Sequence, residues 1–155
     1  MLAQAQDLKY EMSEPIDVST AGWDRLVQMS NGNTLLFHFE ARKGIIVKVF
    51  DKGHKEISSK KHVCSILDIN ALDRSRFDNL VAVGDEALLL VNQYVDNKET
   101  LLRLRIDGNT GALIKEDKLV QSESFALTKR SFFLKQPLAD HYYIVSMGTL
   151  RADET

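Results

Sequence analysis

Apolar positions along this chain fall into short segments, alternating or continuous, that are separated by turn residues. The first four segments span residues 24–29, 34–41, 45–50 and 55–63, and the next four span 79–83, 87–95, 101–106 and 112–120. Gly, Asn and Asp are frequent between neighbouring segments, as in antiparallel strands joined by tight turns. The pattern therefore predicts two sets of four β-strands.

The two sets repeat one another. Leu26-Val27 recurs as Leu80-Val81, and Leu35-Leu36 recurs as Leu89-Leu90, both 54 positions later. In the third strands the matching offset is 57, and a third, unfinished copy begins near Leu134. The alternation of apolar and polar positions survives these offsets, which predicts that the copies fold alike. A period of this size is typical of stacked supersecondary units.

Two local features refine this prediction. Asn31-Gly32 favours a type I′ hairpin turn, because both residues tolerate a positive φ. Residues 23–27 also have the spacing of one helix face, but their counterpart, 77–83, contains β-branched valines, so we expect a strand in both copies. Between the copies, residues 68–76 are expected to form a helical turn.

The strands of a set differ in polarity. The second strands, 34–41 and 87–95, contain continuous apolar runs that suit burial on both faces. The fourth strand of the first set, 55–63, is largely polar. Four-stranded sheets stacked around an axis need such a gradient from inner to outer strands. This architecture is the β-propeller, whose blades are four-stranded antiparallel sheets.

Residues 31–37, 49–53 and 105–111 resemble blades of secreted bacterial β-propeller proteins, and the resemblance extends over residues 22–148. It carries neither the WD nor the kelch signature. The resemblance implies an all-β fold of repeated four-stranded antiparallel blades, a partial β-propeller of about two blades plus the start of a third. It implies no particular activity, because propellers serve as enzymes, glycan binders and assembly platforms alike.

The expected organisation has four parts: an N-terminal segment (1–21), a first blade with its connection (22–76), a second blade with its connection (77–130) and the start of a third blade (131–155). Propellers close with more blades than this. We favour a chain that is the N-terminal piece of a longer protein. Copies that complete one another, or blades packed into a different closed β fold, remain open.

Composition narrows the classes of partner. The chain has 155 residues, of which 44% are hydrophobic and 27% charged, enough for one domain with a core. Its net charge of −2 is spread over interspersed charges, so we expect no nucleic-acid partner. No apolar run approaches the roughly 18 residues that a membrane span requires, and we expect none.

The first residues bear on localisation. Ala3 and Ala5 fit the small-x-small pattern that precedes a signal-peptide cleavage site, so residues 1–5 are interpreted as a possible signal remnant. This favours a secreted or periplasmic protein. The alternative is a frayed polar terminus that happens to contain two alanines. Cys64 is the single cysteine, which excludes an intrachain disulfide.

Catalytic and metal signatures are missing. The sequence has no Gly-x-Ser-x-Gly elbow and no phosphate-binding glycine loop. Asp107-x-Asn109-x-Gly111 begins like a calcium loop, but Lys118 stands where the bidentate glutamate belongs, so a hairpin turn is expected. We expect no cofactor, no metal and no catalytic residue in this chain.

Candidate binding residues fall into two groups. His38, Asn92 and Ser146 recur at steps of 54 inside the apolar second strands, from which they could converge on a ligand. The alternative is that each forms a local hydrogen bond. Loops on rigid sheets commonly carry function. Arg42, in the loop between strands two and three, is therefore a candidate, and so are Arg74 and Arg76, in the connection between blades.

These observations favour a non-catalytic, secreted or periplasmic scaffold or binding module that recognises a protein partner or a glycan through its inter-blade loops. One alternative is part of a glycan-processing hydrolase whose catalytic residues lie outside this chain. Another is an oligomerising structural protein, in which the open faces of the blades pair between copies.

Overall fold

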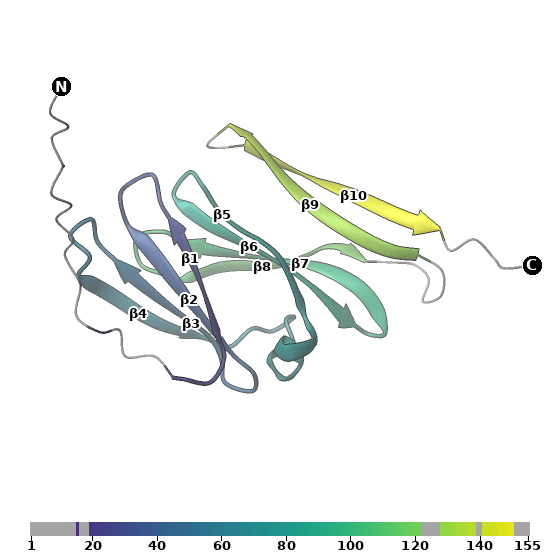
Figure 1. Ribbon diagram of the computed structural model, residues 1–155, viewed down its shortest axis with the longest axis horizontal. Coiled ribbons are helices and arrows are strands. Elements are labelled where there is room, and N and C mark those ends of the chain that lie inside the picture. The colour runs from purple at the N-terminus through teal and green to yellow at the C-terminus, as the bar shows by residue number, and fades with distance from the viewer. Residues whose placement is uncertain (1–14, 16–18, 122–127, 139–140, 151–155) are drawn as a thin grey trace, which may run out of the picture.

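The computed structural model describes residue 15 and residues 19–121, 128–138 and 141–150, and these are built almost entirely of antiparallel strands (Figure 1). The first sheet contains β1 (Trp23–Gln28), β2 (Thr34–Glu40), β3 (Gly44–Phe50) and β4 (Glu56–His62). The second contains β5 (Arg76–Val83), β6 (Glu86–Val95), β7 (Lys98–Asp107) and β8 (Leu113–Gln121). A 3₁₀ helix, η1 (Ile69–Arg74), joins them, and β9 (Thr128–Leu138) pairs with β10 (His141–Leu150).

The predicted strands are confirmed. Each of the eight sequence segments matches a strand to within three residues at either end. Residues 23–27 form strand rather than helix, and the expected helical turn is η1. The second strands β2 and β6 are almost wholly buried, whereas β4 is largely exposed, as the polarity gradient predicted. The possible signal remnant at residues 1–5 lies outside the described residues.

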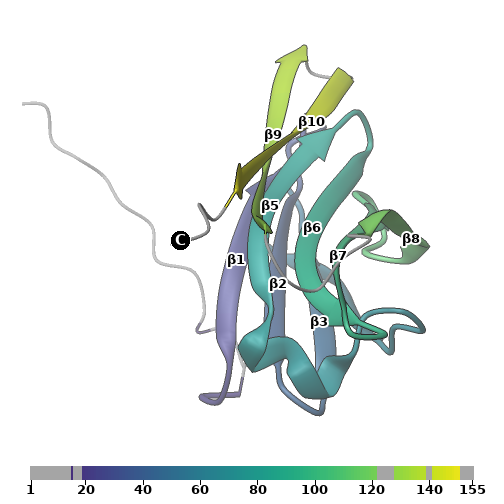
Figure 2. The same ribbon diagram turned by 90° about the vertical axis from the view of Figure 1, so that its right-hand side faces the viewer.

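The two four-stranded sheets stack in the same orientation (Figure 2). Trp23 of β1 contacts Phe77 of β5, while Ser58 of β4 donates a hydrogen bond to the carbonyl of Thr110, beside β8. The β1–β2 and β7–β8 turns lie at one end, where Asn31 bonds Asn109. The first strands of the two sheets, β1 and β5, therefore lie side by side and run in the same direction, and so do the fourth strands, β4 and β8. In addition, β9 contacts β5.

The main core fills the space between the two sheets. One side of β2 and β3 faces one side of β6 and β7, and their core residues are Leu35, Phe37, Phe39, Ile45, Val47, Val49, Ala87, Leu89, Val91, Leu102, Leu104 and Ile106. At the β1–β5 edge, the rings of Trp23 and Phe39 stack with centroids 4.0 Å apart, and Phe77 meets both. The apolar face of each sheet is thus buried against the other sheet.

The residue-by-residue register of the repeat was wrong by one position in the second and third strands. Because the sheets stack in the same orientation, equivalent residues must point the same way along the stack. Leu35 points from the first sheet toward the second, but Leu89, 54 positions later, points back toward the first. The β1–β2 loop has three residues and the β5–β6 loop has two, Gly84 and Asp85, which shifts β6 by one residue.

The type I′ prediction at Asn31-Gly32 was also wrong. The Met29 amide bonds the Asn33 carbonyl, and the Gly32 amide bonds the Met29 carbonyl, so the loop has three residues. Only Gly32 takes a positive φ there, 90°, which is typical of a type I turn followed by a G1 bulge. The two adjacent positive φ values of a type I′ turn occur instead at Asp96 (52°) and Asn97 (60°).

Polar contacts fix the outer strands of the two sheets to each other. The Glu116 carboxylate on β8 accepts hydrogen bonds from the amides of Ser65, Ile66 and Leu67 and from the Ser65 hydroxyl. His62 Nε2, at the end of β4, donates to the Gly111 carbonyl at 2.7 Å. The bonds of Ile66, Leu67 and His62 satisfy half-buried and buried polar groups that would be costly to leave without partners.

The buried His62 predicts a pH-dependent stability. Burial lowers the pKa of its imidazole below the ordinary 6.5, and the hydrogen bond to Gly111 opposes this only in part. The unfolded state therefore binds the proton more readily, so the contribution of His62 is complete above pH 6.5 and is lost as the pH falls toward the folded-state pKa. We expect His62→Gln to flatten the dependence of unfolding free energy on pH between about 7 and 5.

Urea unfolding at a series of pH values measures this effect. His54→Asn is the matched control, because His54 is exposed and its positive φ of 61° suits asparagine. An unchanged pH profile in His62→Gln, or an equal flattening in His54→Asn, would contradict the assignment.

Candidate functional site

The end of the stack that carries η1 is held in a fixed conformation. Asp68 caps η1, accepting from the Asn70 amide at 2.9 Å. Gln93, which is 4% exposed, bonds both backbone groups of Asp68 and the Ser75 hydroxyl, so one amide side chain holds both ends of η1. The connection between the sheets is therefore a rigid platform and not a loose linker.

Two predicted loop residues lie on this platform. Arg42 sits in the β2–β3 turn with a positive φ of 69°, and its amide donates to the Ile69 carbonyl of η1 at 3.0 Å. Arg74, in the last turn of η1, is exposed, with its Nε 3.9 Å from the Asp73 carboxylate. The exposed guanidinium groups of Arg42 and Arg74 are thus carried by two elements that are hydrogen-bonded together.

The other two predicted residues at this end are brought side by side. Arg76 and Asn92 are register partners on β5 and β6. Arg76 Nε donates to Asp78 at 2.6 Å, and this bond raises the pKa of the guanidinium. Asn92 Nδ2 donates to Glu99 Oε1 at 2.8 Å. With Tyr94, the register partner of Glu99, these residues form the Arg76 cluster: Arg76, Asp78, Asn92, Tyr94 and Glu99.

The Arg76 cluster combines a ring with several hydrogen-bonding groups. Tyr94 is 66% exposed and shares the side of β6 that carries Asn92, the side that faces away from the first sheet. The sequence did not identify Tyr94 and Asp78 as candidate binding residues. The signal was Tyr94 itself, an aromatic residue that ends an apolar strand next to the polar Asp96-Asn97 turn.

His38 does not join Asn92. Its ring lies on the outer face of the first sheet, where Nδ1 is 2.7 Å from Asp24 Oδ1, whereas Asn92 lies on the outer face of the second sheet. The two sheets separate them, so this pair does not converge on one ligand. Each residue instead makes a local hydrogen bond, as the alternative predicted, His38 with Asp24 and Asn92 with Glu99. The side chain of Ser146, the third member, lies outside the described part of the chain.

The surroundings of His38 are polar. Its Nε2 is buried without a hydrogen-bond partner among the described residues, and it lies 3.8 Å from Glu40 Oε2. The Lys43 ammonium, 2.6 Å from the other oxygen of Glu40, holds the pKa of that carboxyl below its usual value. His38 therefore remains a candidate binding residue by itself, with the carboxylates of Asp24 and Glu40 on either side of its ring.

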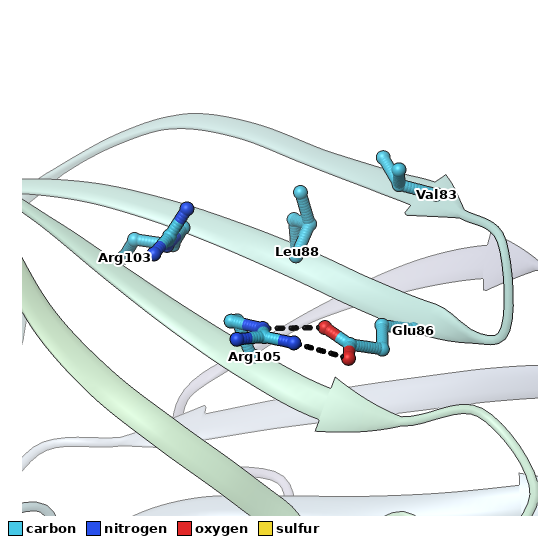
Figure 3. A pocket seen from close by; sticks show the side chains of 5 residues that line it. All are labelled: Val83, Glu86, Leu88, Arg103 and Arg105. Atoms are coloured by element: carbon cyan, nitrogen blue, oxygen red, sulfur yellow. Dashed lines mark hydrogen bonds and ion pairs between the residues drawn. The ribbon is translucent and has the colours of Figure 1, made fainter. Parts of the chain in front are cut away.

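A shallow pocket of about 300 Å³ lies on the outer face of the second sheet and is lined by Val83, Glu86, Leu88, Arg103 and Arg105 (Figure 3). Both nitrogens of the Arg105 guanidinium edge bond Glu86, and this lowers the pKa of the carboxyl. Arg103 donates from Nε and Nη2 to a single oxygen of Asp117, Oδ2. Because each arginine is already in a charged pair, the pocket offers balanced charge around the apolar side chains of Leu88 and Val83.

Catalytic chemistry gains no new support from the described residues. Burial raises the pKa of the Cys64 thiol to about 12, which keeps it protonated and unreactive at neutral pH. Asp107 forms a hairpin turn, its carboxylate accepting from the amides of Asn109 and Thr110. Within the described ranges, no three acidic, His or Cys side chains are grouped so that they could hold a metal.

Across residues 19–121, 128–138 and 141–150, no helix is long and apolar enough to cross a membrane. Comparisons with protein-family models, with curated proteins and with solved structures each give no match to this chain.

Proposed function

We propose that this chain is part of a β-propeller-like protein and that it serves as a non-catalytic binding module, secreted or periplasmic, which recognises a glycan. The propeller assignment is supported by two four-stranded sheets stacked in the same orientation and by the contacts of β1 with β5 and of β5 with β9. Successive blades of a propeller repeat one sheet by rotation, which gives this kind of stacking.

The Arg76 cluster is the observation that carries the proposed function. A sugar ring offers an apolar face, which can lie on the exposed ring of Tyr94, and hydroxyl groups at its edge. Asn92, Arg76 and the carboxylates of Asp78 and Glu99 place both donors and acceptors beside that ring. A small number of polar groups with fixed orientation, next to an aromatic surface, is typical of sites that bind small ligands. A protein partner is the alternative that the test below distinguishes.

A glycan array followed by titration calorimetry tests the proposal. We expect the unmodified chain to bind at least one glycan and Tyr94→Ala to weaken this binding about tenfold or more, the equivalent of about 1.4 kcal/mol. Tyr94→Phe should retain most of the affinity, because it keeps the ring. Arg42→Ala and Arg74→Ala, which change neighbouring exposed side chains, should have smaller effects.

Leu26→Ala is the matched control, because Leu26 is 64% exposed against 66% for Tyr94 but lies on the first sheet. Equal loss of binding in both variants, or no glycan binding by the unmodified chain, would overturn the proposal and favour a protein partner. Release of a shortened glycan would favour the hydrolase alternative.

A further inference from the structure

Asn31-Gly32 is the one Asn-Gly pair in the sequence, and it lies in the three-residue loop between β1 and β2. The Asn31 side chain is exposed, and Gly32 takes a positive φ of 90°. Asparagine is thermolabile because the amide nitrogen of the following residue can attack its side-chain carbonyl carbon. The attack is least hindered before glycine, which has no Cβ beside the attacking nitrogen. This loop therefore carries the pair in the sequence that is most prone to the reaction.

The folded loop opposes this reaction through three hydrogen bonds. Asn31 Oδ1 accepts from the Asn33 amide at 2.9 Å, and Asn31 Nδ2 donates to Asn109 Oδ1, in the β7–β8 turn of the second sheet, at 2.7 Å. The Gly32 amide, which supplies the attacking nitrogen, donates to the Met29 carbonyl at 3.1 Å. Ring closure requires the Asn31 side chain to turn toward Gly32 and the Gly32 amide to give up its proton, so both groups must first leave these partners.

We infer that Asn31 is a deamidation site whose rate is set by its contact with Asn109, between the two sheets. When the loop opens, the Gly32 nitrogen bonds to Asn31 Cγ and the bond from Cγ to Nδ2 breaks. The proton of the Gly32 amide leaves with the Nδ2 nitrogen as ammonia, and a succinimide remains. Water, the only other reactant, then opens the succinimide at either carbonyl and gives aspartate or isoaspartate at position 31.

Both products remove the hydrogen bond that protected the site. A carboxylate has no hydrogen to donate to Asn109 Oδ1, and isoaspartate also lengthens the backbone of the loop by a methylene group. The neighbouring bond between the sheets, from Asn33 Nδ2 to the Gly108 carbonyl at 3.2 Å, is then left without the support of the Asn31 contact. Deamidation is therefore a one-way loosening of this end of the stack. It is independent of the Arg76 cluster, which lies at the opposite end, beside η1.

Peptide mapping by mass spectrometry during incubation in mildly alkaline buffer tests the inference. We expect Asn31 to convert about tenfold or more slowly in the folded chain than in the chain unfolded in urea, because the reaction needs the open loop. Asn109→Ala should raise the folded-state rate about three- to tenfold, the effect of losing one hydrogen bond. Asn109→Asp is the matched control: it keeps an acceptor oxygen for Asn31, so its rate should stay near that of the unmodified chain.

Three results would overturn the inference: no conversion of Asn31 in urea, equal rates in the folded and unfolded chains, or equal rates in Asn109→Ala and Asn109→Asp. If Asn109→Ala fails to fold, the unmodified chain decides the matter at urea concentrations below its unfolding transition. Conversion of Asn31 should then rise in proportion to hydrogen exchange of the Gly32 amide, which measures opening of the loop. A rate of conversion that does not follow this exchange would show that opening of the loop does not control the reaction.

Discussion

Replacing Phe39 by alanine is expected to lower the free energy of unfolding by about 3–5 kcal/mol, the range for deleting a buried aromatic ring. Phe39 is 1% exposed, stacks on Trp23 with centroids 4.0 Å apart and meets Phe77 at 4.7 Å. It is the shared neighbour of an aromatic residue on β1 and one on β5. Its loss therefore leaves a cavity at the contact between the two sheets, and the aromatic pair contributions are lost as well.

Urea unfolding followed by tryptophan fluorescence measures this change, because Trp23 is the single tryptophan and reports on the contact directly. Phe50→Ala is the matched control: the same deletion in the same sheet, at a half-buried position outside the main core. We expect its cost to be less than half that of Phe39→Ala. Equal costs would show that the aromatic contact does not hold the sheets together.

Replacing Glu116 by alanine is expected to cost about 3 kcal/mol, and more if the loop cannot rearrange. Its carboxylate accepts four hydrogen bonds from Ser65, Ile66 and Leu67, so the variant leaves three backbone amides and a hydroxyl without their acceptor. Hydrogen bonds to a charged acceptor are stronger than neutral ones, and the half-buried amides of Ile66 and Leu67 would be costly to leave without a partner. Glu116→Gln keeps one amide oxygen as acceptor, so its free energy of unfolding should lie between those of the unmodified protein and Glu116→Ala.

Thermal or urea unfolding gives the result, with Glu56→Ala as the control. Glu56 is exposed, and its ion pair with Lys48, 3.1 Å long, is a surface contact. Such pairs contribute about 0–1 kcal/mol. If Glu116→Ala destabilised no more than Glu56→Ala, the segment 65–67 would not depend on the β8 carboxylate for its conformation.

Together, Phe39 and Glu116 explain how the candidate site is positioned. Phe39 fixes the first strands of the two sheets against each other, and Glu116 fixes the segment that leaves β4. Between these points, Gln93 holds η1, so the platform with Arg42 and Arg74 has little freedom. The Arg76 cluster begins directly after η1, and its geometry therefore depends on contacts that contain none of its own residues.

Strand positions were predictable because they follow from local chemistry. The alternation of apolar residues, the turn residues Gly32, Gly44 and Gly84, and the continuous apolar runs of β2 and β6 require only that neighbouring side chains point to opposite faces. The three-residue loop at 30–32 was not predictable from the Asn-Gly pair, because loop length is fixed by how the flanking strands pair. The β1–β2 loop is one residue longer than the β5–β6 loop, and this difference shifts the register of β6 relative to β2.

The candidate site was predictable only in part. Arg42, Arg74 and Arg76 were found because loops and connections are identifiable from the sequence. The pairing of Arg76 with Asn92 and the addition of Tyr94, Asp78 and Glu99 depend on cross-strand register. His38 and Asn92 are 54 positions apart in the sequence repeat, but the shorter β5–β6 loop shifts β6 by one residue, so their side chains face opposite sides of the stack. Periodicity alone does not distinguish the two faces of a sheet.

The order, type and burial of the strands were therefore contained in the linear pattern, since each depends on residues a few positions apart. The side of each sheet that meets its neighbour, and with it the grouping of polar side chains at the η1 end, was decided by packing in three dimensions. The alternation of side chains along a strand does not show which face of the sheet packs against a neighbouring sheet. That is determined by contacts between residues far apart in the chain, such as Phe39 and Phe77.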